Sequence, residues 1–213
     1  MEEEQAARGV LLASGEEGLA LLAETVRTTE DVDLAVRTAR ALTQADAGDR
    51  VSGAALLHVF QTCDRNAVHH VVGLLDALPA GVEAGAALPV VRAELEDPDG
   101  DRRWAAVEAL SAVRGDDEAV LGLLRETLED PTLRAYAFDA LGRMGRIEDR
   151  VVPLLEAQAR RGRLEAVNAL GPLAVASRIA RATLHRLAAS DDEVLRDFAT
   201  RRLVEVPAAD VAR

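Results

Sequence analysis

The chain has 213 residues, and its composition is 49% hydrophobic and 29% charged but only 2% aromatic. This balance excludes a disordered chain, and the abundance of Ala and Leu over β-branched and aromatic residues favours helices over strands. The net charge of −12 argues against a general nucleic-acid binder, because affinity for phosphate depends on clustered cations.

Composition also bears on where the protein works. The single cysteine, Cys63, excludes an internal disulfide and fits a reducing cytosol. All 25 basic residues are Arg, which we interpret as the codon bias of a GC-rich, bacterial genome. The opening MEEEQAARG lacks the basic and apolar segments of a signal peptide, and no apolar run approaches the ~20 residues of a membrane span. We therefore expect an acidic cytoplasmic protein.

A leucine that closes a run of small residues recurs at a nearly constant interval. It stands at Leu11, Leu42, Leu74, Leu110, Leu141, Leu170 and Leu203, so the successive intervals are 31, 32, 36, 31, 29 and 33 residues. A regular period of this length indicates a repeat architecture. The unit diverges over residues 1–100, is clearest over 101–131, 132–162 and 163–192, and is truncated over 193–213.

The first half of each clear unit is predicted to be a helix with an alanine seam. The pattern is Arg, two residues, Ala, two residues, Ala-Leu, at positions 103–110, 134–141 and 163–170. Apolar residues three positions before and after the leucine complete a helical stripe: Val107, Phe138, Val167, Val113, Met144 and Leu173. The paired alanines would let a neighbouring backbone come close, and Gly142 and Gly171 are interpreted as helix ends.

A second helix is predicted in each unit, with stripes such as Val120, Leu124 and Leu128. The sequence Leu-Glu-Asp-Pro at 95–98 and 128–131 is expected to end it, with Asp as a cap and Pro in the first turn of the next helix. Acidic residues after Gly115 and Gly145 are expected to begin the second helix, where the helix dipole favours negative charge.

Two helices of this size cannot bury both their faces alone, so neighbouring units must stack. The sequence therefore predicts an all-α fold, a right-handed α-solenoid of about six stacked two-helix repeats in a single domain over residues 1–213. The alternative, an Ala-rich helical bundle, predicts no fixed interval.

The segment Asp101–Pro131, DRRWAAVEALSAVRGDDEAVLGLLRETLEDP, resembles a short HEAT repeat of the phycobilisome-lyase type. Matching positions include Asp101, Ala109, Leu110, Gly115 and Asp116, followed by the apolar residues of the second helix. The resemblance is strong over 101–173 and weaker elsewhere. It implies an armadillo-type α-solenoid whose second helices line a concave binding face. The tetratricopeptide and ankyrin patterns are absent.

Candidate catalytic and metal-binding residues are few. His58, Cys63, His69 and His70 have the donor atoms for zinc, but their spacing favours ordinary packing. Some HEAT proteins are di-iron hydroxylases that present His-Glu pairs, and this chain contains no His-Glu dipeptide. The basic cleft and aromatic residues of the HEAT-like DNA glycosylases are also missing in bulk. We therefore assign no catalytic residue, metal or cofactor.

Aligning the second helices on their apolar pairs predicts two adjacent rows of side chains along the concave face. From the polar members of these rows we take seven as candidate binding residues: His58, Arg92, Arg125, Glu156, His185, Glu129 and Arg160. One interpretation is a track for an extended peptide or a partner helix. The other is intrahelical pairing at i, i+4, namely Arg92 with Glu96, Arg125 with Glu129, and Glu156 with Arg160.

The only tryptophan, Trp104, could anchor a partner, but we expect it to fill a gap in the core. The function expected is a non-catalytic protein–protein scaffold or adaptor. The alternative is a HEAT-type enzyme or cofactor-handling accessory, such as a tetrapyrrole-attachment helper or a glycosylase-like protein. A third hypothesis is a nucleic-acid binder that uses Arg160, Arg161 and Arg163.

Overall fold

The computed structural model describes residues 16–29, 50–63 and 81–207, together with 31, 34, 35, 37, 38, 41, 71–73 and 75. It divides into two compact units, Met1–Gly122 and Leu123–Arg213, which we call unit 1 and unit 2. Three of the aligned leucines (Leu11, Leu42 and Leu74) lie outside the described residues, as do His69 and His70.

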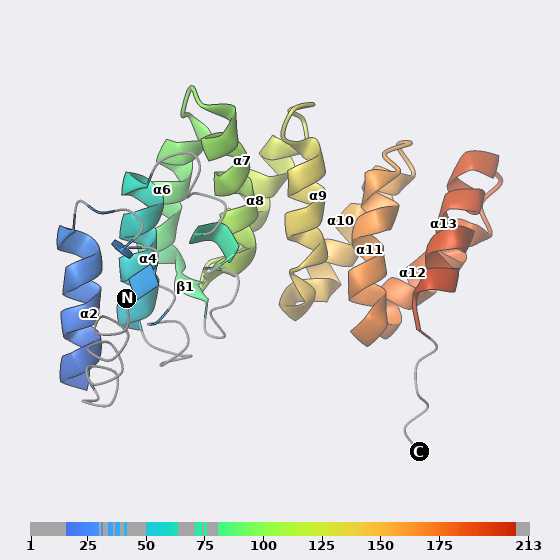
Figure 1. Cartoon of the computed structure of the whole chain (residues 1–213). Coiled ribbons are helices and arrows are strands. Elements are labelled where there is room, and N and C mark those ends of the chain that lie inside the picture. The colour runs from blue at the N-terminus through green and yellow to red at the C-terminus, as the bar shows by residue number, and fades with distance from the viewer. Residues whose placement is uncertain are drawn as a thin grey trace, which may run out of the picture. The chain divides into compact units, whose positions relative to one another are not determined.

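Unit 1 is built from helices that pair in sequence order (Figure 1). Its elements are α2 (Glu16–Thr28), α4 (Arg50–Thr62), β1 (Val82–Glu83), α6 (Ala84–Leu95), α7 (Gly100–Ala109), the 3₁₀ helix η1 (Leu110–Ala112) and β2 (Val113–Arg114). Helix α4 packs against α2 and α6, and α6 packs against α7. The next helix, α8 (Asp117–Thr127), begins in unit 1 and ends in unit 2.

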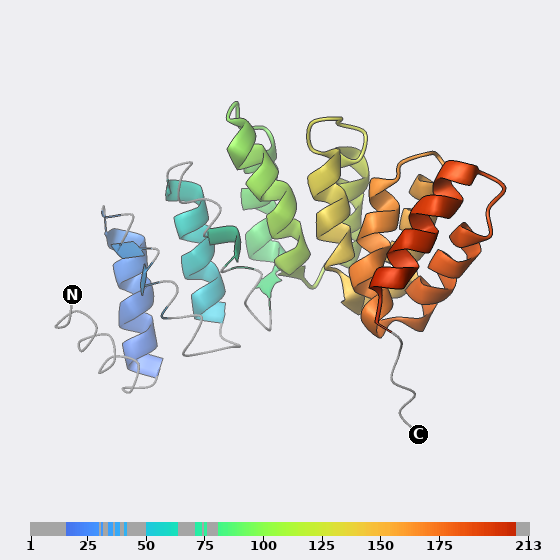
Figure 2. The same cartoon turned by 45° about the vertical axis from the view of Figure 1, so that its right-hand side comes forward.

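Unit 2 shows two layers of helices. Its elements after α8 are α9 (Arg134–Gly142), the 3₁₀ helix η2 (Gly145–Ile147), α10 (Glu148–Ala159), α11 (Glu165–Ala176), α12 (Arg178–Ala188) and α13 (Glu193–Glu205). The first helices α9, α11 and α13 pack side by side in that order, and the second helices α10 and α12 form the other layer (Figures 1 and 2). Each added pair therefore covers the open side of the pair before it, as in a solenoid.

The alanine seam and the apolar stripe form the core, as the sequence predicts. In the three clear repeats, the paired alanines and the leucine that follows them are all at most 4% exposed. They are Ala106, Ala109, Leu110, Ala137, Ala140, Leu141, Ala166, Ala169 and Leu170. Val120, Leu124 and Leu128 of the second helix are completely buried. Burial of about 25 cal/mol per Å² of apolar surface across the layers is what stabilises helices of only 9 to 13 residues.

Gly142 marks a close approach between the first helices α9 and α11. It is the last residue of α9, and a Cβ atom placed there would lie 3.1 Å from the carbonyl oxygen of Ala169 on α11. The sequence interpretation as a helix end is confirmed for Gly142 but is wrong for Gly171, which lies inside α11. Position 171 needs a residue without a side chain, because the side chain of Arg202 from α13 lies directly against it.

The acidic residues before α8 and α13 cap these helices as the sequence predicts, but the aspartates of the two Leu-Glu-Asp-Pro segments do not: the N-cap of α7 is Asp99, and Leu133 before α9 makes no side-chain cap bond. Asp116 Oδ1 accepts from the backbone N–H of Ala119 at the start of α8, and Asp192 caps α13 by accepting from Leu195. The prolines differ from the prediction. Helix α6 ends at Leu95 and α8 at Thr127, but Pro98 and Pro131 precede the next helix rather than lying in its first turn. The turns are longer because Asp97 and Asp130 fold back onto the amides two residues on.

An arginine near the start of a first helix donates a hydrogen bond back to the turn that precedes the helix. Arg103 donates to the carbonyl oxygen of Asp97 (2.8 Å), Arg134 to that of Leu128 (2.8 Å) and Arg196 to that of Ser190 (3.1 Å), each six residues upstream. Arg163 also donates to the carbonyl oxygen of Leu128 (3.2 Å). The arginines at or just before the starts of two successive first helices, Arg134 and Arg163, therefore both bond to the end of one second helix. Carbonyls at helix ends lack intrahelical partners, and these guanidinium groups supply them.

A two-residue parallel strand pair joins equivalent turns of unit 1. Val82 pairs with Val113 and Glu83 with Arg114. Gly81, just before β1, has φ +67°, and a Cβ atom there would lie 2.3 Å from the carbonyl oxygen of Ala112. The pair is too short to change the class: in the described residues the chain is an all-α solenoid.

Candidate functional site

Most of the candidate binding residues lie on second helices, whereas Glu129 lies in the turn after α8 and Arg160 is the C-cap residue that follows α10. His58 of α4 is half-buried and Arg92 of α6 is exposed in unit 1. In unit 2, Arg125 of α8 and His185 of α12 are exposed, and Glu156 of α10 is half-buried. Within each unit, we call the solvent-facing side of its second helices the second-helix face.

Glu156 joins α10 to α12 through two arginines. Its Oε1 accepts from Arg160 Nη2 at 2.9 Å, and its Oε2 accepts from Arg186 Nη2 at 2.6 Å. The same Arg186 nitrogen donates to Thr183 Oγ1 at 2.7 Å. The hydrogen bonds from Arg186 and then from Arg160 lower the pKa of Glu156, against the opposing effect of burial. The i, i+4 pair predicted between Glu156 and Arg160 is thus confirmed as part of a larger cluster.

Glu129 does not pair with Arg125 as the i, i+4 interpretation expects. Its two oxygens accept instead from Nη1 (3.2 Å) and Nη2 (2.9 Å) of Arg163, and these bonds lower its pKa. Arg163 is already fixed by bonds to the carbonyl of Leu128 and to Gln158 Oε1, so its fork is the better-ordered partner. In the described part of the chain, neither Arg92 nor Arg125 makes an ion pair.

The two units differ in charge. Residues 1–122 contain 23 Asp and Glu against 10 Arg, a net −13, whereas residues 123–213 contain 14 against 15, a net +1. Helix α12 contributes most clearly to the positive charge of unit 2, because its sequence RIARATLHRLA contains three arginines and a histidine but no acidic residue. Arg186 was missed as a candidate residue; the absence of acids from this helix is the sequence signal that could have revealed it.

Unit 1 holds a buried arginine that the sequence did not single out. Arg102 Nε donates to Glu94 Oε2 at 2.6 Å, and its other nitrogens donate to the carbonyl oxygens of Cys63, Phe60 and Gln61 at the end of α4. The hydrogen bond to Glu94 raises the pKa of Arg102. Because its donors are directed into helix ends of the same unit, this arginine positions α4, α6 and α7 and is not offered to a partner.

The zinc hypothesis finds no support in the residues described. Cys63 is buried and its Sγ lies 3.7 Å from the carbonyl oxygen of Phe60, while two of the proposed histidines lie outside this part of the chain. Among residues with described coordinates, no group of three or more His, Cys, Asp and Glu could hold a metal ion. Trp104, expected in the core, is only half-buried, in the middle of α7.

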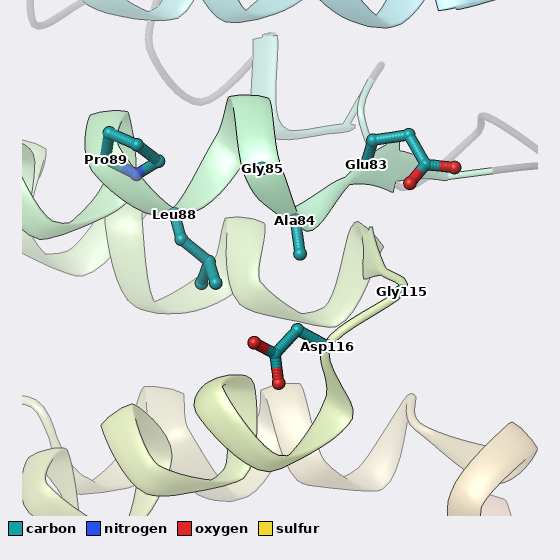
Figure 3. Close-up of a pocket in the computed structure, with 7 residues that line it drawn as sticks. All are labelled: Glu83, Ala84, Gly85, Leu88, Pro89, Gly115 and Asp116. Carbon is teal, nitrogen blue, oxygen red and sulfur yellow. The ribbon is translucent and has the colours of Figure 1, made fainter.

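A hollow of about 380 Å³ opens in unit 1 between the starts of α6 and α8 (Figure 3). It is lined by Glu83, Ala84, Gly85, Leu88, Pro89, Gly115 and Asp116. The side chains of Ala84 and Leu88 are directed towards the turn of Asp116, and the carboxylate of Glu83 lies beside Gly115, where a Cβ atom would be 3.2 Å from its Oε2. Asp116 is occupied as the cap of α8, so this lining offers neither a nucleophile nor a paired acid and base.

No helix in the described residues is long and apolar enough to cross a membrane. No protein-family model matches the chain, and no curated protein matches it in sequence.

Among solved structures, the chain is similar to a crystal structure of a mutant of Kap121p, with a TM-score of 0.51 over 88% of this chain. That protein is a helical solenoid karyopherin of the HEAT and armadillo type. The two sequences are 15% identical, and this chain spans about a quarter (25%) of the length of the other. At this identity the likeness concerns the fold alone, a repeat solenoid.

Proposed function

We propose that this chain is a non-catalytic scaffold or adaptor that binds a protein partner along its second-helix face. The observation that carries the proposal is the layering of unit 2, where stacking puts α10 and α12 side by side with polar side chains on their outer surface. A stacked array holds such side chains in place before a partner arrives, so less entropy is lost on binding.

The binding residues we propose are those of the two rows: His58, Arg92, Arg125, Glu156, His185, Glu129 and Arg160. Arg92 and Arg125 are the best single test, because both are exposed and neither is ion-paired in the described part of the chain. Their substitution should therefore change binding without changing stability.

The test is the double reversal Arg92→Glu/Arg125→Glu. Its affinity for a protein captured by the wild-type chain should fall, while the melting temperature stays within a few degrees. A matched control is Arg143→Glu/Arg201→Glu, which reverses two exposed arginines at the end of α9 and on α13, both first helices. Unchanged affinity after the first reversal, or equal loss in the control, would remove the proposal.

We further propose that residues 1–213 form one right-handed repeat domain of the short HEAT, phycobilisome-lyase type, in the cytoplasm. The single tryptophan, Trp104, lies in unit 1, whereas far-UV circular dichroism reports helices of both units. One domain should unfold in urea with coincident midpoints for the two signals. A tetrapyrrole-handling role, the alternative that this repeat type suggests, would instead be revealed by a visible absorption band in the purified protein.

A further inference from the structure

We propose that the face formed by α10 and α12 binds an acidic peptide segment of the partner through Arg160 and Arg186. This inference rests on the proposed function and names the chemistry of the ligand. It begins from the Glu156 cluster, in which one half-buried carboxylate holds two guanidinium groups, one on each oxygen.

Most N–H donors of Arg160 and Arg186 remain available to a ligand. Their side chains are 52% and 53% exposed, whereas that of Glu156 is 19% exposed. A guanidinium has five N–H donors, and the bonds to Glu156 and Thr183 use one nitrogen of each arginine. One carboxylate neutralises one of the two charges. A net positive charge with ordered, solvent-facing donors therefore remains.

The pairing with Glu156 also prepares the site. Long arginine side chains lose rotational freedom when they bind, and this loss of entropy opposes binding. Here the bonds to Glu156 restrict both guanidinium groups beforehand. A planar guanidinium fork then matches a carboxylate of the ligand better than an ammonium would.

The rest of α12 adds positive charge to the same face. Arg178 is the first residue of the helix, is exposed and makes no ion pair among the described residues, and His185 is exposed one position before Arg186. A cation at a helix N-terminus is unfavourable with the helix dipole, so Arg178 does not stabilise α12. By contrast, Arg181 is used inside the unit, where it donates to the carbonyls of Ala174 and Pro207.

Small side chains lie among the cations. Ala157 of α10 and Ala182 of α12 are both exposed, so a ligand backbone can come close to the helices between the arginines. Charge complementarity selects the ligand. A few cations suit a short segment rich in Asp and Glu, whereas the net charge of −12 over the whole chain opposes the binding of a long nucleic acid.

The experiment is a titration of the full chain into a fluorescein-labelled peptide of alternating Glu and Gly, followed by fluorescence anisotropy at low salt. Three further probes are the matching Gln peptide, the matching Lys peptide and an oligothymidylate of the same formal charge. The variants are Arg160→Gln/Arg186→Gln and, as a control with the same charge change on first helices, Arg143→Gln/Arg201→Gln. Circular dichroism checks that each variant is folded.

We expect the Glu peptide to bind more tightly than the Gln and Lys peptides, and Arg160→Gln/Arg186→Gln to weaken it about tenfold or more, with the control close to wild type. No binding of the Glu peptide, or equal loss in both variants, would overturn the inference. Tighter binding of the oligothymidylate with the same dependence on Arg160 and Arg186 would overturn it in favour of nucleic acid. These failures concern α10 and α12 alone, whereas the Arg92/Arg125 reversal tests partner binding itself.

Discussion

Arg102 in unit 1 and the pair Arg160 and Arg186 in unit 2 are all bound to a glutamate, but they are exposed to very different degrees. The side chain of Arg102 is 14% exposed, and its remaining donors reach three backbone carbonyls at the end of α4. Arg160 and Arg186 are more than half exposed, and a single carboxylate holds both.

The difference shows that the acceptors around a guanidinium decide its role. Carbonyls at a helix end need donors, and an arginine that supplies them is committed to the fold. A carboxylate shared by two arginines leaves donors and one charge available at the surface. Unit 1, with a net −13, uses Arg102 structurally, and unit 2, with a net +1, presents Arg160 and Arg186 to solvent.

Removing the guanidinium of Arg102 should have the largest effect on stability. Arg102→Leu leaves Glu94, a 9% exposed residue, without its charged partner, and should cost about 2–3 kcal/mol of the free energy of unfolding. The double variant Arg102→Leu/Glu94→Leu should recover part of this loss, because no buried charge is left uncompensated. Urea unfolding of the four proteins measures the coupling. An additive double variant would mean that the pair is not a structural unit.

Gly142 should be a sensitive position in the contact between α9 and α11. Gly142→Val forces α9 away from the backbone of Ala169 and should lower the free energy of unfolding by about 2 kcal/mol. Gly122 of α8 is the control, since a Cβ atom there meets nothing within 4 Å. Gly122→Ala should stabilise the chain by about 0.5–1 kcal/mol through helix propensity. Thermal unfolding of both variants gives the comparison, and similar losses would contradict the close approach of α9 and α11.

Arg134 should matter more for stability than Arg125. Arg134→Met removes the donor to the carbonyl of Leu128 and should cost about 1 kcal/mol. Arg125→Met removes an exposed side chain without an ion pair in the described part of the chain, and should change stability by about 0.5 kcal/mol or less. If urea unfolding shows the same loss of free energy for the two variants, the repeated arginine does not stabilise the turn.

The smallest effect expected is a pH dependence of the Glu156 cluster. The pKa of Glu156 is lowered in the folded state, so its ion pairs add stability above the unfolded value of about 4.3 and lose it as pH falls through the folded value. Glu156→Gln should therefore be less stable than wild type near neutral pH, and the difference should shrink in acid. Melting curves across this range provide the measurement, and a gap that widens in acid would contradict it.

The repeat interval and the buried stripes could be predicted because each depends on spacing within one helix. Ala106, Ala137 and Ala166 are buried for the same local reason, the helical period. The partners of Glu129 and Glu156 could not be predicted in full, because Arg163 comes from the turn before α11 and Arg186 from α12. Their meeting depends on how far each helix is displaced along its neighbour, which the spacing of apolar residues does not determine.

The proline turns and Gly171 differ from expectation for a similar reason. Pro98 and Pro131 follow an aspartate that folds back on the next amides, and this local bond moves the helix start by two or three residues. Gly171 reads as a helix end in sequence, but the close passage of Arg202 makes it necessary within α11. Both outcomes depend on contacts that appear only when the chain is folded.

Site-specific photo-crosslinking in cells tests most directly that the second-helix face is the binding surface. A photoreactive residue would replace an exposed alanine of the second helices, Ala157 or Ala182, and, as controls, Ala135 of α9 or Thr200 of α13. We expect the same protein to be cross-linked from positions 157 and 182 and not from 135 or 200. Cross-links formed only from the first helices would contradict the account.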